Sequence, residues 1–390
     1  MNVQLLTRIY QHISSQPIEG DPSFLGGQMS YAFFEAYYQN QFGIEENSRT
    51  WERIIYSLNK IQEDRLMHSF AGGIAGISWV FLHLFNQGLL QDEELDAQSI
   101  IEDLDGPLFE TSMLLLTEGN FDYLHGGLGS FLYFLERTPS LQVTNYIEQL
   151  VEQLSAVAIR FPNGDITWRF DNFGIRDPEA PVLYNLGLSH GTASIVSILS
   201  LFYEKGYART RCQELIEGTL QWMWRVRNKS AESVFPNTVN NSPVDQESRL
   251  AWCYGDLGIA NTFWLAGEKL KNNKWKEIAQ QTILHSISRS ESSALIFDAA
   301  FCHGSAGIAY IFRKFAQRIS EPRLSEAADF WLQKTIAFAL PVKASDVFLS
   351  YHNKEMVSNL SILDGEASIG MMLLSEMGIS TTWDRFLLLS

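Results

Sequence analysis

A short glycine pattern recurs seven times along the 390 residues, and it constrains the fold more than any other feature of the sequence. In each copy a glycine is followed three positions later by Gly or Ser, and then by an apolar run of about two helical turns. Successive copies lie 46 to 65 residues apart, which indicates a repeat architecture or a closed array. The copies begin at Gly27, Gly73, Gly126, Gly191, Gly255, Gly304 and Gly365.

The segment after each glycine predicts a buried helix. Residues 77–82 and 130–135, for example, are almost all apolar, and a helix that is apolar on every side has to be buried. Between the copies lie amphipathic stretches such as 146–158 and 324–339, whose apolar residues recur three and four positions apart. This alternation predicts an all-α fold, an α/α toroid of seven inner and seven outer helices.

The turns before the inner helices are expected to share one rim of this toroid. Glycine lets neighbouring backbones crowd together there, and it would supply a positive φ in each turn. Segments 161–186, 229–250 and 341–360 interrupt the helical pattern, so we expect short strands or loops over the same rim. No linker divides the chain, which predicts a single domain spanning residues 1–390.

Two of these turns carry metal-binding residue types. Cys253 lies two residues before one repeat glycine, and Cys302 and His303 directly precede the next. Two thiolates and one imidazole are one ligand short of a tetrahedron. Structural zinc sites usually have four protein ligands, whereas catalytic sites have three and leave a position for water or substrate. The sequence therefore predicts an open zinc site. The remaining cysteine, Cys212, is expected to be a buried residue of a helix over 211–226.

Composition limits the compartment and the partners. A net charge of −16 argues against binding to nucleic acid, which requires a basic surface. Three cysteines do not suit a disulfide framework. The first residues lack the charged and apolar regions of a signal peptide, and no apolar run is long enough to span a bilayer. We therefore expect a cytoplasmic protein that is not an integral membrane protein.

Three motifs together resemble those of the lanthionine synthetase C-like (LanC) family, which includes the lantibiotic cyclases. Carried by the seven repeats, the resemblance covers essentially the whole chain, and it implies an α/α toroid. It implies one zinc ion per chain, held by Cys253, Cys302 and His303. In order, the motifs are Gly187-Leu188-Ser189-His190-Gly191, Trp252-Cys253-Tyr254-Gly255 and Cys302-His303-Gly304.

The reaction implied by this resemblance is peptide cyclisation. Cysteine thiols of a dehydrated precursor peptide add to dehydroalanine or dehydrobutyrine and close lanthionine or methyllanthionine thioether rings. A lanthipeptide dehydratase and a transporter are further partners that the resemblance suggests, in a complex that would bring the protein to the membrane. Relatives in the same family act on other substrates, so the family alone does not fix the reaction.

The resemblance also suggests catalytic residues. His190 matches the family's catalytic histidine and Asp122 its catalytic aspartate, while Arg249 and Tyr254 match residues around the metal. Imidazole, with a pKa of about 6.5, suits delivery of a proton to an enolate at neutral pH. Asp122 would take the thiol proton or orient His190, and the guanidinium of Arg249 would stabilise the enolate oxygen.

Simpler roles stand beside these assignments. A carboxylate near a helix start, such as Asp122, is often a helix cap, and Arg249 has a carboxylate close by in the sequence, Glu247, with which an arginine often pairs. His125, which precedes Gly126, is not part of the family signature, and we expect an ordinary role for it.

Two other functions compete with cyclisation. One is a zinc-dependent thiol alkyl- or prenyl-transferase, which would favour an Asp-Cys-His ligand set; the adjacent Cys302 and His303 argue against it. The other is a non-catalytic protein that binds zinc and thiol-containing peptides. The presence of both His190 and Asp122 argues against that one.

Overall fold

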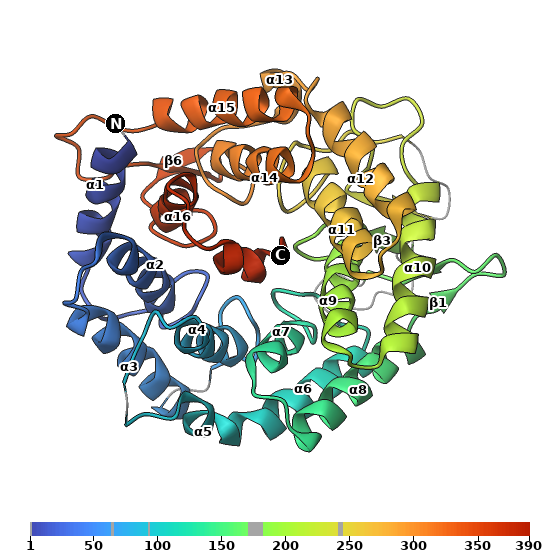
Figure 1. The fold of residues 1–390 in the computed structure, drawn as a ribbon, viewed down its shortest axis with the longest axis horizontal. Coiled ribbons are helices and arrows are strands. Elements are labelled where there is room, and N and C mark those ends of the chain that lie inside the picture. Colours follow the sequence, from blue (N-terminus) through green and yellow to red (C-terminus); the bar gives the residue numbers. More distant parts are fainter. Residues whose placement is uncertain (1, 64–65, 93, 171–181, 241–244) are drawn as a thin grey trace. The chain divides into compact units, whose positions relative to one another are not determined.

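The computed structural model describes residues 2–63, 66–92, 94–170, 182–240 and 245–390. These residues form two compact units, each containing the paired helices seen in Figure 1. The first unit comprises the chain up to residue 102 together with residues 296–381. The second comprises residues 103–295 and the C-terminal residues 382–390.

The first unit contains a row of four inner helices, each packed on the next, and it joins the two ends of the sequence. The outer helix α1 packs on α16, although they are more than 350 residues apart in the chain. In order, the inner row is α14 (Ser305–Arg318), α16 (Glu366–Glu376), α2 (Gln28–Phe42) and α4 (Ile74–Asn86). Their outer partners are α15 (Pro322–Ala337), α1 (Asn2–Ser14), α3 (Ser48–Glu63) and the short α5 (Ala97–Ile100).

The second unit has the same pattern with three inner helices, α7 (Gly129–Glu136), α9 (Thr192–Lys205) and α11 (Asp256–Lys269). Each packs against the outer helix that follows it in the chain, namely α8 (Leu141–Ala156), α10 (Arg209–Arg225) and α12 (Asn273–Ser286). The remaining helical elements nearby in sequence are η1 (Glu102–Leu104), α6 (Asp105–Thr117), α13 (Glu291–Ala294) and η3 (Thr381–Leu387).

Short strands occur within or next to the three segments where the sequence predicted them. Each described sheet is an antiparallel pair. The pairs are β1 (Ile159–Arg160) with β2 (Ile166–Thr167), β3 (Leu183–Asn185) with β4 (Thr238–Asn240), and β5 (Ser350–His352) with β6 (Glu355–Val357). Residues 171–181 and 241–244 of these segments lie outside the described residues.

Burial follows the predicted division between inner and outer helices. Every residue from Thr192 to Phe202 in α9 is buried, as is every residue from Ala75 to Leu84 in α4. The outer helix α8 buries a single stripe, formed by Val143, Ile147, Leu150, Val151, Leu154 and Ser155. Because these two stretches present no wet face, we look for the side chains available for chemistry on the turns that precede the helices.

The repeat glycines work by close backbone approach, and the expected positive φ was wrong for most of them. Only Gly255 has it, at 88°, whereas Gly73 and Gly191 are extended with φ of −143° and −132°. At all seven positions a Cβ atom would collide with the residue six positions earlier, as with Met67 before Gly73 and Asn185 before Gly191. The turn doubles back on the helix start, which leaves no room for a side chain.

Backbone hydrogen bonds join the turns of neighbouring inner helices. In the first unit the amide of Leu25 donates to the carbonyl of Ala71 at 3.0 Å, and that of Cys302 donates to Leu363 at 3.1 Å. In the second unit the amide of Leu188 donates to Cys253 at 2.9 Å. Each of these turns is therefore fixed by its neighbour as well as by its own helix.

Candidate active site

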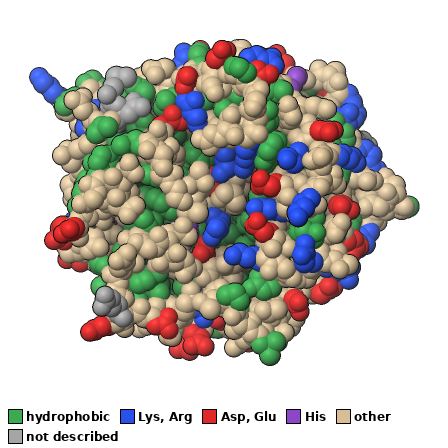
Figure 2. Space-filling model, in the orientation of Figure 1, with side chains coloured by type: hydrophobic (Ala, Val, Ile, Leu, Met, Phe, Trp, Pro, Cys, Tyr) green, Lys and Arg blue, Asp and Glu red, His purple; other side chains and the backbone are tan. Residues whose placement is uncertain are grey.

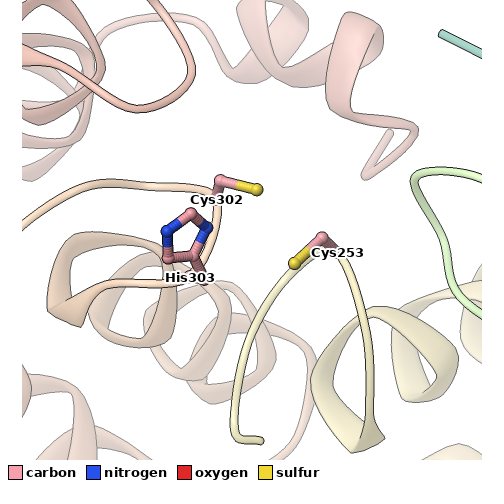
Figure 3. A group of neighbouring side chains, drawn as sticks. All are labelled: Cys253, Cys302 and His303. Atoms are coloured by element: carbon pink, nitrogen blue, oxygen red, sulfur yellow. The ribbon is translucent and has the colours of Figure 1, made fainter. Parts of the chain in front are cut away.

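Cys302 and His303 lie on the turn before α14 in the first unit (Figure 3). Cys302 is buried, and its sulfur lies within 4.8 Å of a ring nitrogen of His303. The Nδ1 atom of His303 is 3.7 Å from Oδ1 of Asp364. A carboxylate beside one ring nitrogen is typical of metal-binding histidines, because it orients the ring and leaves the other nitrogen for the metal.

Cys253 lies on the turn before α11 in the second unit (Figure 3). Its side chain is buried, and its carbonyl oxygen accepts the amides of Leu188 at 2.9 Å and Ser189 at 3.3 Å. Gly187 makes this contact possible, since a Cβ there would come within 2.8 Å of the Cys253 carbonyl. Cys253 is thus held just before a helix N-terminus, which stabilises negative charge and so suits a thiolate.

His190 and Asp122 form a direct contact within the second unit. Nδ1 of His190 lies 2.7 Å from Oδ2 of Asp122, whose side chain is buried. The other carboxylate oxygen accepts the backbone amides of Leu124 and His125, both at 2.8 Å. The carboxylate is therefore fixed by its own turn and orients the imidazole, an arrangement typical of a catalytic base or acid with its orienting group.

Tyr254 packs beside this pair. Its ring centroid is 6.2 Å from that of His190, and its hydroxyl accepts a hydrogen bond from Nδ2 of Asn185 at 2.9 Å. Asn185 was not predicted from the sequence as part of the site. Since Tyr254 follows Cys253 directly, the Asp122–His190 pair and one predicted zinc ligand belong to the same group of turns.

Arg249 is partly buried on the turn that carries Cys253. Within the described part of the chain, no hydrogen bond or ion pair joins its side chain to Glu247 or to the Asp122–His190 pair. Glu247 instead accepts the backbone amides of Glu232 at 2.6 Å and Ser233 at 3.0 Å. Arg249 therefore lies four residues before Cys253 on the same turn, and its predicted role toward the enolate stays a prediction.

A family model for lanthionine synthetase C-like proteins matches residues 18–388. The chain belongs to this family. The Nisin biosynthesis protein NisC of Lactococcus lactis subsp. lactis is 23% identical over 314 residues, which cover 71% of this chain and 70% of NisC. The solved structure of nisin cyclase resembles the chain with a TM-score of 0.75 at 18% identity, covering 100% of this chain and 96% of that one. This likeness confirms the predicted α/α-toroid fold.

The LanC-like fold is also found in proteins with other activities. The structure of an unsaturated glucuronyl hydrolase from Bacillus sp. GL1 covers 97% of each chain with a TM-score of 0.52, at 12% identity. Because that name describes a different reaction, the fold alone does not determine the chemistry. The function of this LanC-like chain has to be inferred from its site residues.

In five of the seven repeats of this LanC-like chain, one position carries a polar side chain that is not buried. The residue directly before the glycine is at least partly exposed between buried neighbours in the third to seventh repeats. Neither His125 nor Asp364 was predicted from the sequence as part of the site, although their shared position was the signal that could have identified them. The five residues are His125, His190, Tyr254, His303 and Asp364.

His125, for which an ordinary role was expected, lies against the catalytic candidates. Its ring is nearly parallel to that of His190, with an interplanar angle of 12° and centroids 5.8 Å apart. Partial burial lowers the pKa of His125; Asp122 opposes this shift and His190 adds to it. His125 is therefore more readily neutral than an exposed histidine.

Cys212 is separate from these groups, as predicted. It is fully buried in α10, and its thiol points to the carbonyl of Tyr207 at 3.6 Å. Burial raises the pKa of this thiol to about 12, so the residue stays protonated and is a poor metal ligand.

A second group of possible ligands, His12, Asp346 and Glu366, lies in the first unit. Nδ1 of His12 is 3.0 Å from Oε2 of Glu366, and the other oxygen of Glu366 accepts the amides of Val347 and Phe348. These contacts fasten α1 and the segment before α16 to the start of α16. We interpret the group as a structural ion pair.

Proposed function

We propose that this chain is a lanthipeptide cyclase. It adds cysteine thiols of a dehydrated precursor peptide to dehydroalanine or dehydrobutyrine and so forms lanthionine and methyllanthionine rings. Family membership and the likeness to NisC, a protein named for nisin biosynthesis, support this reaction. The observation within the chain that carries the proposal is the 2.7 Å contact between Asp122 and His190, beside the turn that holds Cys253.

We further propose that Cys253, Cys302 and His303 together bind one zinc ion per chain. The donor set fits: two buried sulfurs and an imidazole beside a carboxylate are ligands that zinc prefers. Zinc held by these residues would supply Lewis-acid activation of the peptide's cysteine thiol, which favours the reactive thiolate. As thiolates, Cys253 and Cys302 would offset the charge of the ion, so that the substrate sulfur would keep its nucleophilic electron density.

The chain's own residues would manage the proton. The carbon–sulfur bond forms at the β-carbon of the dehydro residue, and the resulting enolate has to be protonated at its α-carbon. The Asp122 carboxylate, fixed by two amides, contacts Nδ1 of His190, orients the ring and leaves Nε2 as the proton donor. The proton lost by the thiol restores the charge on His190, so the peptide's mass does not change.

Arg249 and Tyr254 complete the proposed site. The Arg249 guanidinium would stabilise the enolate oxygen by a charge-assisted hydrogen bond. Tyr254, fixed through its hydroxyl by Asn185, would shape the wall between the thiolate position and His190. We assign the precursor peptide as the substrate, and a dehydratase and a transporter as further proposed partners.

Among the described residues, no helix has the length and apolar character needed to cross a membrane. Figure 2 shows acidic and basic side chains interspersed on one face of the molecule, unlike the continuous basic surface typical of nucleic-acid-binding proteins. We propose that the protein acts in the cytoplasm on a peptide and joins the membrane only through its biosynthetic partners.

The direct test is incubation of the zinc-loaded protein with a dehydrated, cysteine-containing precursor peptide. The expected result is loss of thiols that react with an alkylating reagent, at unchanged peptide mass. The same peptide without protein is the control for spontaneous addition. Thiols that stay alkylatable while zinc is bound would reject the cyclase proposal.

A further inference from the structure

The C-terminal residues 382–390, which we call the strap, lie in the second unit although the residues before them belong to the first. The strap is deeply buried: Trp383, Leu387, Leu388 and Leu389 are fully inaccessible to solvent, and Phe386 is 1% exposed. A segment this buried needs partners for its backbone polar groups.

Three successive carbonyls of the strap are bound by side chains. Tyr123 donates its hydroxyl to the carbonyl of Phe386 at 2.7 Å, and Trp252 donates its indole N–H to Leu387 at 2.8 Å. Asn261 donates its amide to Leu388 at 3.1 Å. All three donor side chains are buried, so each hydrogen bond is shielded from water.

The two aromatic donors are direct neighbours of the residues that matter for chemistry. Tyr123 follows Asp122, and Trp252 precedes Cys253. Burial raises the pKa of Tyr123 well above its ordinary value, so the phenol keeps the proton that it donates. The strap therefore binds two turns through adjacent carbonyls. One turn carries Asp122, which contacts the proposed acid His190, and the other carries Cys253, a proposed zinc ligand.

The strap is itself held in a demanding conformation. Leu388 has a φ of 56°, a left-handed backbone that a leucine adopts only when its surroundings impose it. Its amide donates to the carbonyl of Arg385 at 2.9 Å, and Arg385 pairs with the buried Glu136 at 2.8 Å. Contacts outside the two turns thus hold the backbone carbonyls of residues 386–388 in place.

We infer that the strap is a positioning element for the proposed active site, and that Tyr123 and Trp252 act as its positioning residues. This inference rests on the proposed function, because it concerns the turns of Asp122 and Cys253. Tyr123 fixes the position of the turn that carries Asp122, and so of the Asp122–His190 pair. Trp252 fixes the position of the turn that carries the sulfur of Cys253.

The test uses the full chain with Trp252→Phe and Tyr123→Phe, which remove one N–H or O–H and keep the ring. The chain offers matched controls. Trp168→Phe removes the indole hydrogen bond to Leu154 at 2.9 Å, and Tyr133→Phe removes the hydroxyl hydrogen bond to Asp105. Both control side chains are as buried as the test residues, and the acceptors of these two hydrogen bonds lie outside the strap.

Amide hydrogen exchange measures how firmly the backbone of each turn is held, and it does not depend on activity. We expect faster exchange over residues 250–255 in Trp252→Phe and over 120–126 in Tyr123→Phe, and in the strap of both. The control variants should lose stability without these local changes. If the turns of the test variants exchange as they do in the controls, the inference is wrong.

Measurements of zinc binding and activity then distinguish the role of Trp252 from that of Tyr123. Trp252→Phe should weaken zinc binding about tenfold and shift the visible spectrum of the cobalt(II)-loaded protein. Tyr123→Phe should bind zinc like the wild type but slow ring formation at least about tenfold, with an altered pH profile. Zinc affinity and spectrum unchanged in Trp252→Phe would overturn its assigned role.

Failure of the proposed function gives a different result. If the wild type neither binds zinc nor closes rings, the function falls, whereas the exchange comparison still decides whether the strap positions the turns. Should either aromatic variant not fold, Asn261→Ala removes the third hydrogen bond of the strap and is measured by the same exchange comparison. Unchanged exchange in the strap of that variant would count against the inference.

Discussion

His190 and Asp122 make the best-defined polar contact among the proposed catalytic residues. An imidazole that delivers a proton needs both a donor nitrogen and a fixed orientation. Replacing His190 by Asn removes the imidazole that transfers the proton, and we expect the rate of ring formation to fall by roughly a factor of 10² or more. Zinc content should stay at the wild-type value, because His190 is not a proposed ligand.

The matched control for this variant is His285→Asn. His285 is an exposed histidine that contacts the carbonyl of Glu232, and its loss should leave the rate unchanged. Full-rate ring formation by His190→Asn with normal zinc content would remove His190 from the mechanism. The measurement is the initial rate of thiol loss, followed by alkylation and mass spectrometry.

Asp256, the first residue of α11, gives a prediction about stability and pH. Burial raises its pKa from 3.8 to about 6, although the carboxylate accepts the amides of Val234 and Phe235. Folding therefore favours its protonated form. That contribution is fully present below the pKa of the unfolded chain and is lost as the pH rises through about 6.

The rise of this pKa from 3.8 to about 6 corresponds to about 3 kcal/mol of stability. We therefore expect the free energy of unfolding of the wild type, relative to that of Asp256→Asn, to fall by about this amount between pH 4 and pH 7. Urea unfolding of both proteins at several pH values measures it. A difference that is constant over this range would contradict the assignment.

The turns before the inner helices are the elements on which the site is built, and Gly255 has the tightest requirements among them. It combines a φ of 88° with a position where a Cβ would overlap the carbonyl of Arg249. Gly164, in the hairpin between β1 and β2, has the same φ but open space around it. The two glycines therefore separate backbone strain from lack of room.

We expect Gly164→Ala to cost about 1 to 2 kcal/mol of stability from backbone strain alone. Gly255→Ala should cost about 1 to 3 kcal/mol more, because the turn has to move away from the new methyl group. It should also weaken zinc binding, since Cys253 lies on the displaced turn. Equal losses of stability in the two variants would show that close approach at Gly255 is unimportant.

Much of the whole molecule follows from the sequence. The repeat predicted the inner helices, and the helical spacing of apolar residues predicted the wet and buried faces of α8 and α15. These predictions succeeded because each depends on residues close together in the chain. The reason for the glycines was only half right, because a collision with a backbone six residues away leaves no local signal.

Other features were out of reach because they depend on contacts that are distant in sequence. Tyr123 and Trp252 bind carbonyls more than 130 residues further on, and carbonyl acceptors carry no residue identity. Asp364 and His125 could have been found by aligning the position before each repeat glycine. The single domain over residues 1–390 and the convergence of Cys253 with Cys302 and His303 stay predictions.

We propose above all that Cys253, Cys302 and His303 together bind one zinc ion. It is tested most directly by elemental analysis of purified, reduced wild type beside Cys253→Ala, Cys302→Ala and the control Cys212→Ala. We expect one zinc per chain in the wild type and in Cys212→Ala, and less than stoichiometric zinc in the other two variants. Stoichiometric zinc retained by either Cys253→Ala or Cys302→Ala, or its absence from the folded wild type, would contradict it.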